Sequence, residues 1–188
     1  MEQIIAHTVE VLRRGGVILY PTDTIWGIGC DARNAEAVER LYDIKERDRS
    51  KSMLVLVEKN RNHLNILNTP IIPNDRPTTY ILPRTIWHDA MHLAVADNLP
   101  ADDGTLGVRI PNHIFCQEVL RHLGAPLVST SANLSGHPSP HTYNDIEEAL
   151  IQRVDYCVPP LPTFLSDETC GSRIVKVNPD GSQTVIRP

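Results

Sequence analysis

The sequence predicts an α/β protein with a mixed sheet, and two observations carry this prediction. Near the N-terminus, an apolar strand over residues 17–20, a helical pattern over 34–47 and a second apolar strand over 53–57 follow one another. This alternation is typical of a parallel strand–helix–strand unit. Toward the C-terminus, short strands follow one another without crossover helices, which indicates antiparallel neighbours and therefore a mixed sheet.

Helices are predicted where apolar residues recur at helical spacing, over residues 3–13, 34–47, 114–123 and 143–152. Gly15 and Gly16 end the first of them, Asn34 is the expected N-cap of the second, and Gly124 ends the third. Short apolar runs bounded by turn residues predict strands at 17–20, 53–57, 79–83, 92–95, 106–110, 125–130, 155–158, 173–177 and 183–187.

Length and composition indicate one domain over residues 1–188, in which 41% hydrophobic residues suffice for a core. No apolar run approaches the roughly 20 residues that a membrane-spanning helix needs. The N-terminal segment carries its acids first and its arginines last, the reverse of a secretory signal, so we expect a cytoplasmic protein without a membrane partner.

Charge and cysteine content exclude further classes. The four cysteines are far apart and form no Cys-x-x-Cys pair, which disfavours a zinc cluster. The net charge of −5 argues against indiscriminate binding of nucleic acid, although a local basic site remains compatible with it. The segment His88–His92, HDAMH, resembles a zinc-binding motif, but its surroundings have little helical character, so no metal site is expected there.

Three polar clusters stand at the ends of predicted elements: residues 22–24 (TDT), 45–52 (KERDRSKS) and 129–136 (STSANLSG). Two of them directly follow buried strands, and ligands of open α/β sheets lie beyond the carboxyl ends of strands. Each cluster also has an ordinary structural reading, because basic residues complement a helix C-terminus and serine or asparagine caps helices and turns. No P-loop, no Gly-x-Gly-x-x-Gly after the first strand and no Gly-x-Ser-x-Gly elbow is present.

Taken together, four ordered motifs resemble the YrdC/YciO family, most closely its threonylcarbamoyl-AMP synthase branch. They are YPTDTIWGIGCDA, AVERLYDIKERDRSK, GTLGVRIPN and STSANLSG. The family pairs a Lys-x-Arg element, here Lys45 and Arg47, with a later Ser-x-Asn element, here Ser131 and Asn133. The resemblance covers nearly the whole chain and implies a YrdC-like domain, a twisted mixed sheet with helices around a concave basic cavity.

The resemblance also implies an activity. Such an enzyme makes threonylcarbamoyl-AMP and pyrophosphate from L-threonine, bicarbonate and ATP, with Mg²⁺ carried by the nucleotide and no metal bound by the protein itself. Its product passes to threonylcarbamoyl-transferase proteins that modify tRNA, and tRNA is itself a candidate ligand. The alternative is a non-catalytic paralogue of the same fold that binds RNA or nucleotide.

The resemblance assigns roles to individual residues. The catalytic residues would be Lys45 and Arg47. The threonine would be bound by Thr24, Arg109, Thr130 and Ser172. The nucleotide would be bound by Lys45, Arg47, Lys51, Thr105, Ser131, Asn133 and Arg187.

The segment after the first strand contains two more features of interest. Gly27 and Gly29 are expected to let the backbone lie close to a small substrate. Asp23 would either pair with a substrate ammonium or cap the turn, and we favour the turn.

Overall fold

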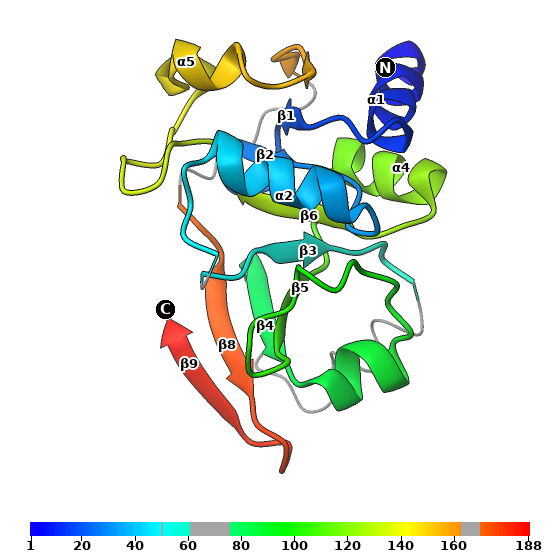
Figure 1. The fold of residues 1–188 in the computed structure, drawn as a ribbon, viewed down its shortest axis with the longest axis vertical. Helices are drawn as coiled ribbons and strands as arrows, with labels where there is room; N and C mark the ends of the chain where they lie inside the picture. The colour runs from blue at the N-terminus through cyan, green and yellow to red at the C-terminus, as the bar shows by residue number, and fades with distance from the viewer. Residues whose placement is uncertain (50, 61–75, 163–169) are drawn as a thin grey trace.

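The structure of the chain is a computed structural model that describes residues 1–49, 51–60, 76–162 and 170–188 (Figure 1). Its helices are α1 (Glu2–Arg13), α2 (Ala35–Ile44), the π-helix η1 (Thr85–Ala90), α4 (Ile114–Leu123), the 3₁₀ helix η2 (Tyr143–Asp145) and α5 (Glu148–Ile151). Its strands are β1 (Ile18–Tyr20), β2 (Gly27–Gly29), β3 (Leu54–Leu56), β4 (Thr78–Leu82), β5 (Leu106–Arg109), β6 (Leu127–Ser131), β7 (Tyr156–Cys157), β8 (Arg173–Val177) and β9 (Gln183–Arg187).

The described strands form one mixed sheet in the order β7-β1-β2-β6-β3-β5-β4-β8-β9. The pairs β1–β7, β3–β5 and β4–β8 are parallel, and the other neighbours are antiparallel. The predicted mixed α/β sheet is therefore confirmed. None of the helices in the described ranges is both long enough and apolar enough to cross a membrane.

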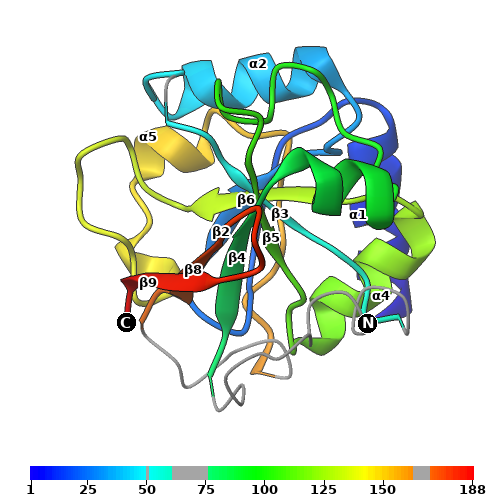
Figure 2. The ribbon, with the colours of Figure 1, turned by 90° about the horizontal axis from the view of Figure 1, so that it is seen from below.

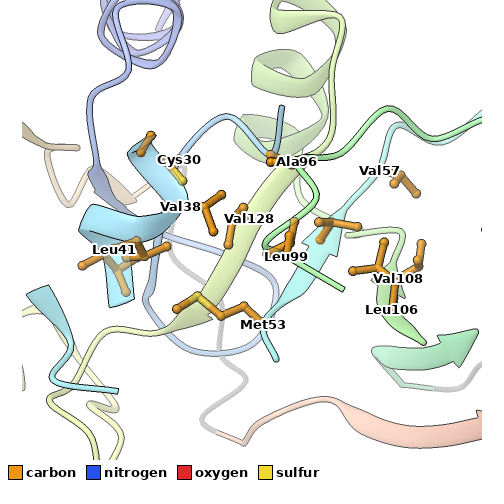
Figure 3. Close-up of a cluster of buried hydrophobic side chains, with 14 of the residues drawn as sticks. Cys30, Val38, Leu41, Met53, Val57, Ala96, Leu99, Leu106, Val108 and Val128 are labelled. Atoms are coloured by element: carbon orange, nitrogen blue, oxygen red, sulfur yellow. The ribbon is translucent and has the colours of Figure 1, made fainter. Parts of the chain in front are cut away.

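Two hydrophobic clusters lie on opposite faces of the central strands, because successive residues of a strand point to opposite sides. In β6, Val128 joins the cluster that packs under α2, whereas Leu127 joins the cluster under α1 and α4. Figure 2 shows α2 and α4 on opposite sides of the sheet. Figure 3 shows the α2 cluster, in which Val38 and Leu41 of the helix face Val128 and Met53.

The helix ends agree with the residues that predicted them. The side chain of Asn34 accepts a hydrogen bond of 3.0 Å from the backbone N–H of Ala37 and so caps α2. Gly124 adopts the left-handed conformation at φ 67° and ends α4. Asn34 therefore fixes where α2 begins, and Gly124 fixes where α4 ends.

The strand β2 was not predicted, and its presence corrects the topology of the first unit. β1 turns back into β2, so the predicted parallel pairing of strands 17–20 and 53–57 is wrong: β1 and β3 run in opposite directions. The parallel unit is β2-α2-β3, with β6 inserted between its two strands. Two of the three residues of β2 are glycines, and one isolated apolar residue gives no periodic signal.

Three further local predictions are corrected. Residues 92–95 form no strand, and His92 has a positive φ of 54°. The segment before it is helical, because η1 covers residues 85–90 where little helical character was expected. The predicted helix 143–152 is split into η2 and α5, since Asp145 closes a capping box with Thr142 and Ile146 is extended.

Gly29 is explained by strand packing and not by a nearby substrate. A Cβ on Gly29 would lie 1.7 Å from the carbonyl oxygen of Val128, whereas one on Gly27 would lie 3.1 Å from a ring carbon of Tyr20. Gly29 is therefore required by the contact between β2 and β6. A role in letting a ligand approach the backbone stays a prediction for Gly27 only.

We predict that Gly29→Ala lowers the free energy of unfolding by roughly 2–3 kcal/mol, since a backbone oxygen must move to accept the methyl group. Gly27→Ala is the matched control and should cost less, because the Tyr20 ring it meets is a side chain that can shift. Urea denaturation of both variants measures the difference. Equal losses in the two variants would contradict this account of β2.

Candidate functional site

One cavity of about 430 Å³ brings the three polar clusters of the sequence together. Thr22 and Thr24 line it from the segment after β1, Arg47 and Ser52 from the segment after α2, and Ser131 from the end of β6. Residues of β4, β5, β8 and β9 complete its wall. Among the described residues that line it are three arginines and no carboxylate, so the cavity suits an anion.

The cavity receives most of the predicted site residues. Its lining includes Thr24, Arg47, Thr105, Arg109, Thr130, Ser131, Ser172 and Arg187. Three predicted residues stand outside this lining, namely Lys45, Lys51 and Asn133. The contacts of these three residues differ from the contacts with nucleotide that were predicted for them.

Lys45 approaches the cavity from the α2 side of the sheet and is buried, with 1% of its surface exposed. Its ammonium donates hydrogen bonds to the carbonyl oxygens of Ser131, at 2.5 Å, and Asn133, at 2.6 Å. Its own carbonyl accepts the N–H of Ser135 at 2.9 Å. Lys45 therefore ties the end of α2 to the segment after β6, and its predicted contact with phosphate is replaced here by contacts with the backbone.

Burial and the positive charge of Arg47 lower the pKa of Lys45 to about 7. The ammonium has two oxygen partners but no carboxylate among the contacts described, so its charge is balanced only by carbonyl dipoles. An anion placed in the neighbouring cavity would favour the protonated form. Lys45 can thus respond to a ligand without lining the cavity itself.

Arg47 is held in place by backbone carbonyls, and no acid pairs with it in the part of the chain that the structure describes. Its Nε donates to the carbonyl of Lys51 at 2.9 Å and its Nη2 to that of Ser52 at 3.0 Å. Glu46 adopts a positive φ of 51°, which takes the chain out of the helix between Lys45 and Arg47. Burial lowers the pKa of Arg47, but a guanidinium stays charged, so it presents its positive charge to the cavity.

Lys51 contributes through its backbone, because its carbonyl orients Arg47 while its side chain is exposed. Asn133 uses its amide nitrogen on the carbonyls of Leu134, at 3.0 Å, and His137, at 2.6 Å. Its buried Oδ1 has no hydrogen-bond partner in the described structure. Asn133 can therefore accept from a hydroxyl, an amine or a cation, but it has no donor left for phosphate.

Arg109, at the end of β5, forms a buried ion pair with Asp23 at 3.0 Å, which the sequence reading did not anticipate. Asp23 also accepts the N–H of Asn112 at 2.8 Å. It neither caps its own turn nor faces the cavity as a partner for a substrate ammonium, so both readings of this residue are corrected. The ion pair joins two segments that are 86 residues apart in sequence.

Arg187 brings the last strand into the site. Its Nε donates to the carbonyl of Ser172 at 3.0 Å, and its Nη2 donates to the same oxygen. The hydroxyl of Ser172 is hydrogen-bonded to that of Thr79 at 2.7 Å. A Cβ on Gly171 would lie 3.0 Å from Nη2 of Arg187, so glycine gives this arginine its room.

Some lining residues were given no individual role by the sequence: Thr22 and Ser129 lie inside the predicted polar clusters, whereas Thr79 and Ser139 lie outside them. Ser129 has a signal in the sequence, because alternate residues of a strand share a face and it lies two positions before Ser131. Thr79 has none, since its place in the wall depends on how β4 pairs with β8.

The histidines of the HDAMH segment make no metal site with their described neighbours. The ring of His88 contacts the carboxylate of Asp89 at 2.7 Å. In the ranges that the structure covers, no group of three or more His, Cys, Asp or Glu residues is arranged to hold a metal ion.

The fold and the cavity together define a class: an α/β protein with a cavity whose arginines and hydroxyl groups suit an anionic ligand. A model of the Sua5/YciO/YrdC family, described as "Telomere recombination", matches residues 10–188. The chain therefore belongs to this family, as the four ordered motifs predicted.

Curated relatives extend the comparison. The chain is 32% identical over 163 residues to a threonylcarbamoyl-AMP synthase of Pseudoalteromonas translucida, a match that covers 84% of this chain and 86% of that protein. It is 38% identical over 157 residues to the protein of the same name from Xanthomonas campestris pv. campestris, covering 78% and 80%. The crystal structure of P. abyssi Sua5 complexed with L-threonine matches the fold with a TM-score of 0.76 at 20% identity, over 98% of this chain and 53% of that one.

We predict that the wild-type protein gains stability relative to Lys45→Met as the pH rises from about 7 to about 10. The pKa of Lys45 is lowered from 10.5 to about 7 on folding, so in this window the unfolded chain binds a proton that the folded chain has released. Stability then rises with pH by up to roughly 1.4 kcal/mol per unit, and the methionine variant lacks this contribution.

Urea denaturation of both proteins at pH 6, 7.5 and 9 measures this difference. All other titrating groups are common to the two chains, so they cancel in the comparison. A difference in unfolding free energy that stays constant across the range would contradict the lowered pKa of Lys45.

Proposed function

We propose that this protein is an L-threonylcarbamoyladenylate synthase, which makes threonylcarbamoyl-AMP and pyrophosphate from L-threonine, bicarbonate and ATP. The observation that carries the proposal is the cavity, where Arg47, Arg109 and Arg187 meet hydroxyl groups and no lining carboxylate is described. The names of the relatives agree with it, since these proteins match most of the chain.

The arginines divide between the two charged substrates. Arg109 lies beside Thr24 and would take the carboxylate of threonine. Arg47 and Arg187 line the same cavity from other elements and would hold the phosphates of ATP. Guanidinium groups suit both tasks because they stay charged and offer several donors in one plane.

The reaction needs no nucleophile from the protein. The threonine amine attacks the carbon of bicarbonate, with loss of water, or of carbon dioxide, with loss of a proton, and gives a carbamate in either case. A carbamate oxygen then attacks the α-phosphorus of ATP, the bond to the β-phosphate oxygen breaks, and pyrophosphate leaves. Catalysis consists of holding mutually repelling anions together and neutralising charge as it builds up, as in other phosphoryl transfers.

The other residues position these groups. Lys45 would hold the Ser131–Asn133 segment against α2, and its charge would add to the field of the cavity. Thr105, Thr130, Ser131 and Ser172 would supply neutral hydrogen bonds to threonine and nucleotide. Mg²⁺ would enter with ATP, and its remaining ligands would be phosphate oxygens and water, because the described lining offers no carboxylate.

The wider role is also part of the proposal. Residues 1–188 would form one YrdC-like domain in the cytoplasm. Its product would pass to threonylcarbamoyl-transferase proteins that modify tRNA, with tRNA itself a candidate ligand. The competing proposal is a paralogue that binds RNA or nucleotide without catalysis.

We predict that the purified protein releases pyrophosphate from ATP only when threonine and bicarbonate are both present. Pyrophosphate is measured with each substrate omitted in turn. The synthase is excluded if pyrophosphate is released equally well without threonine and without bicarbonate, or if none is released at all. Binding of RNA that weakens steeply with salt, in a protein without this activity, would favour the paralogue.

We further predict that Arg47→Ala lowers kcat/KM for ATP by roughly 10²–10³, by analogy with the loss of other preorganised contacts to developing negative charge. Arg14→Ala is the matched control, since it removes one exposed arginine just after the end of α1. Near wild-type activity in a folded Arg47→Ala protein would refute the assignment of this cavity.

A further inference from the structure

Asp23 is a buried carboxylate with no place in the mechanism above. Only 7% of its surface is exposed, and it is not among the residues that line the cavity. Its Oδ1 accepts from Nη1 of Arg109 at 3.0 Å, and its Oδ2 accepts from the N–H of Asn112 at 2.8 Å. Both oxygens thus hold groups at the end of β5, one a side chain and the other backbone.

The contacts of Arg109 leave one edge of its guanidinium free. Nη1 serves both Asp23 and the hydroxyl of Thr24, the latter at 3.1 Å. Nε is buried and has no hydrogen-bond partner in the described structure. A buried donor without a partner costs stability unless a ligand satisfies it. Arg109 also lines the cavity, so the part of its guanidinium that is not held at Nη1 is the part that a ligand there can use.

Whereas Arg109 offers donors, the hydroxyl of Thr24 offers an acceptor, because its neighbours take up its only proton. The hydroxyl of Thr22 lies 2.8 Å from the carbonyl oxygen of Ile25. Because a carbonyl oxygen can only accept, Thr22 donates its hydroxyl hydrogen to it. The contact of 2.9 Å between the hydroxyls of Thr22 and Thr24 must then use the proton of Thr24. Thr24 presents only an acceptor to the cavity.

We infer that Asp23 is a positioning residue that fixes how an amino acid is oriented in the cavity. By holding Nη1, Asp23 fixes the guanidinium of Arg109 in the cavity wall, with its remaining donors left for a carboxylate. Oγ1 of Thr24, which also accepts from Nη1 of Arg109, would then accept from the amine of the same ligand. This inference rests on the proposed function, since it names the contacts of the threonine that the synthase uses.

The arrangement explains why a buried acid stands next to an anion site. Asp23 cancels part of the charge of Arg109, which lowers the attraction for anions in general. It also limits the guanidinium to one orientation, and a fixed planar fork selects a carboxylate by geometry. Asp23 thus weakens the attraction of Arg109 for anions in general and makes it selective for a carboxylate.

The test is the binding of two ligands to Asp23→Asn, measured by calorimetry: L-threonine, and L-threoninol, which has an alcohol in place of the carboxylate. In asparagine an NH₂ group replaces one carboxylate oxygen, so a donor then opposes either Nη1 of Arg109 or the N–H of Asn112. We expect the affinity for threonine to fall roughly 10- to 100-fold, as for loss of a hydrogen bond to a charged group. The affinity for threoninol should change little.

Asp31→Asn is the matched control, because Asp31 is a buried acid paired with Arg33 and does not line the cavity. It should leave the affinity for threonine unchanged. Asp23→Glu keeps the charge and should lose less affinity than Asp23→Asn, which supplies a second test if the asparagine variant does not fold.

The possible outcomes separate the two proposals. Unchanged threonine affinity in Asp23→Asn, or equal weakening of threonine, threoninol and a non-hydrolysable ATP analogue, overturns the positioning role. A glutamate variant as weak as the asparagine variant does the same. A wild-type protein that binds no threonine overturns the synthase, and the inference falls with it.

Discussion

The structure depends on one buried side chain, that of Lys45, whose terminal nitrogen donates to the carbonyl oxygens of Ser131 and Asn133 from the end of α2. α2 packs on the face of the sheet opposite α1 and α4, and the side chain of Lys45 extends from its C-terminal end to the last residue of β6. This contact joins two motifs that are more than 80 residues apart in sequence, and it sets the wall against which the cavity forms.

Around that wall, the fold brings together three arginines that lie far apart in the sequence. Arg47 follows α2, Arg109 ends β5 and Arg187 lies on β9, and each is oriented by oxygen atoms of the protein itself. Arg47 and Arg187 are held by carbonyl groups, which orient a guanidinium without cancelling its charge. Of these three arginines, Arg109 alone is paired with an acid among the described residues, which separates general attraction from selective recognition.

The sequence predicted what local chemistry determines. The cap at Asn34, the left-handed Gly124 and the ordered Lys-x-Arg and Ser-x-Asn motifs were readable because each depends on a few neighbouring residues. The strand β2 was not, since Gly27 and Gly29 give no periodic signal and their pairing is decided by distant strands. Asp23 was misread for the same reason: its partner Arg109 comes close only through the sheet.

Hydrogen–deuterium exchange of the segment Ser131–Ser135 tests the central claim most directly, because Lys45 holds it at both ends. In Lys45→Met, the amides of Ala132, Asn133 and Ser135 should exchange faster than in the wild-type protein, while those of α1 and α4 should not change. Unaltered exchange in that segment, in a folded variant, would mean that the buried ammonium does not hold the site together.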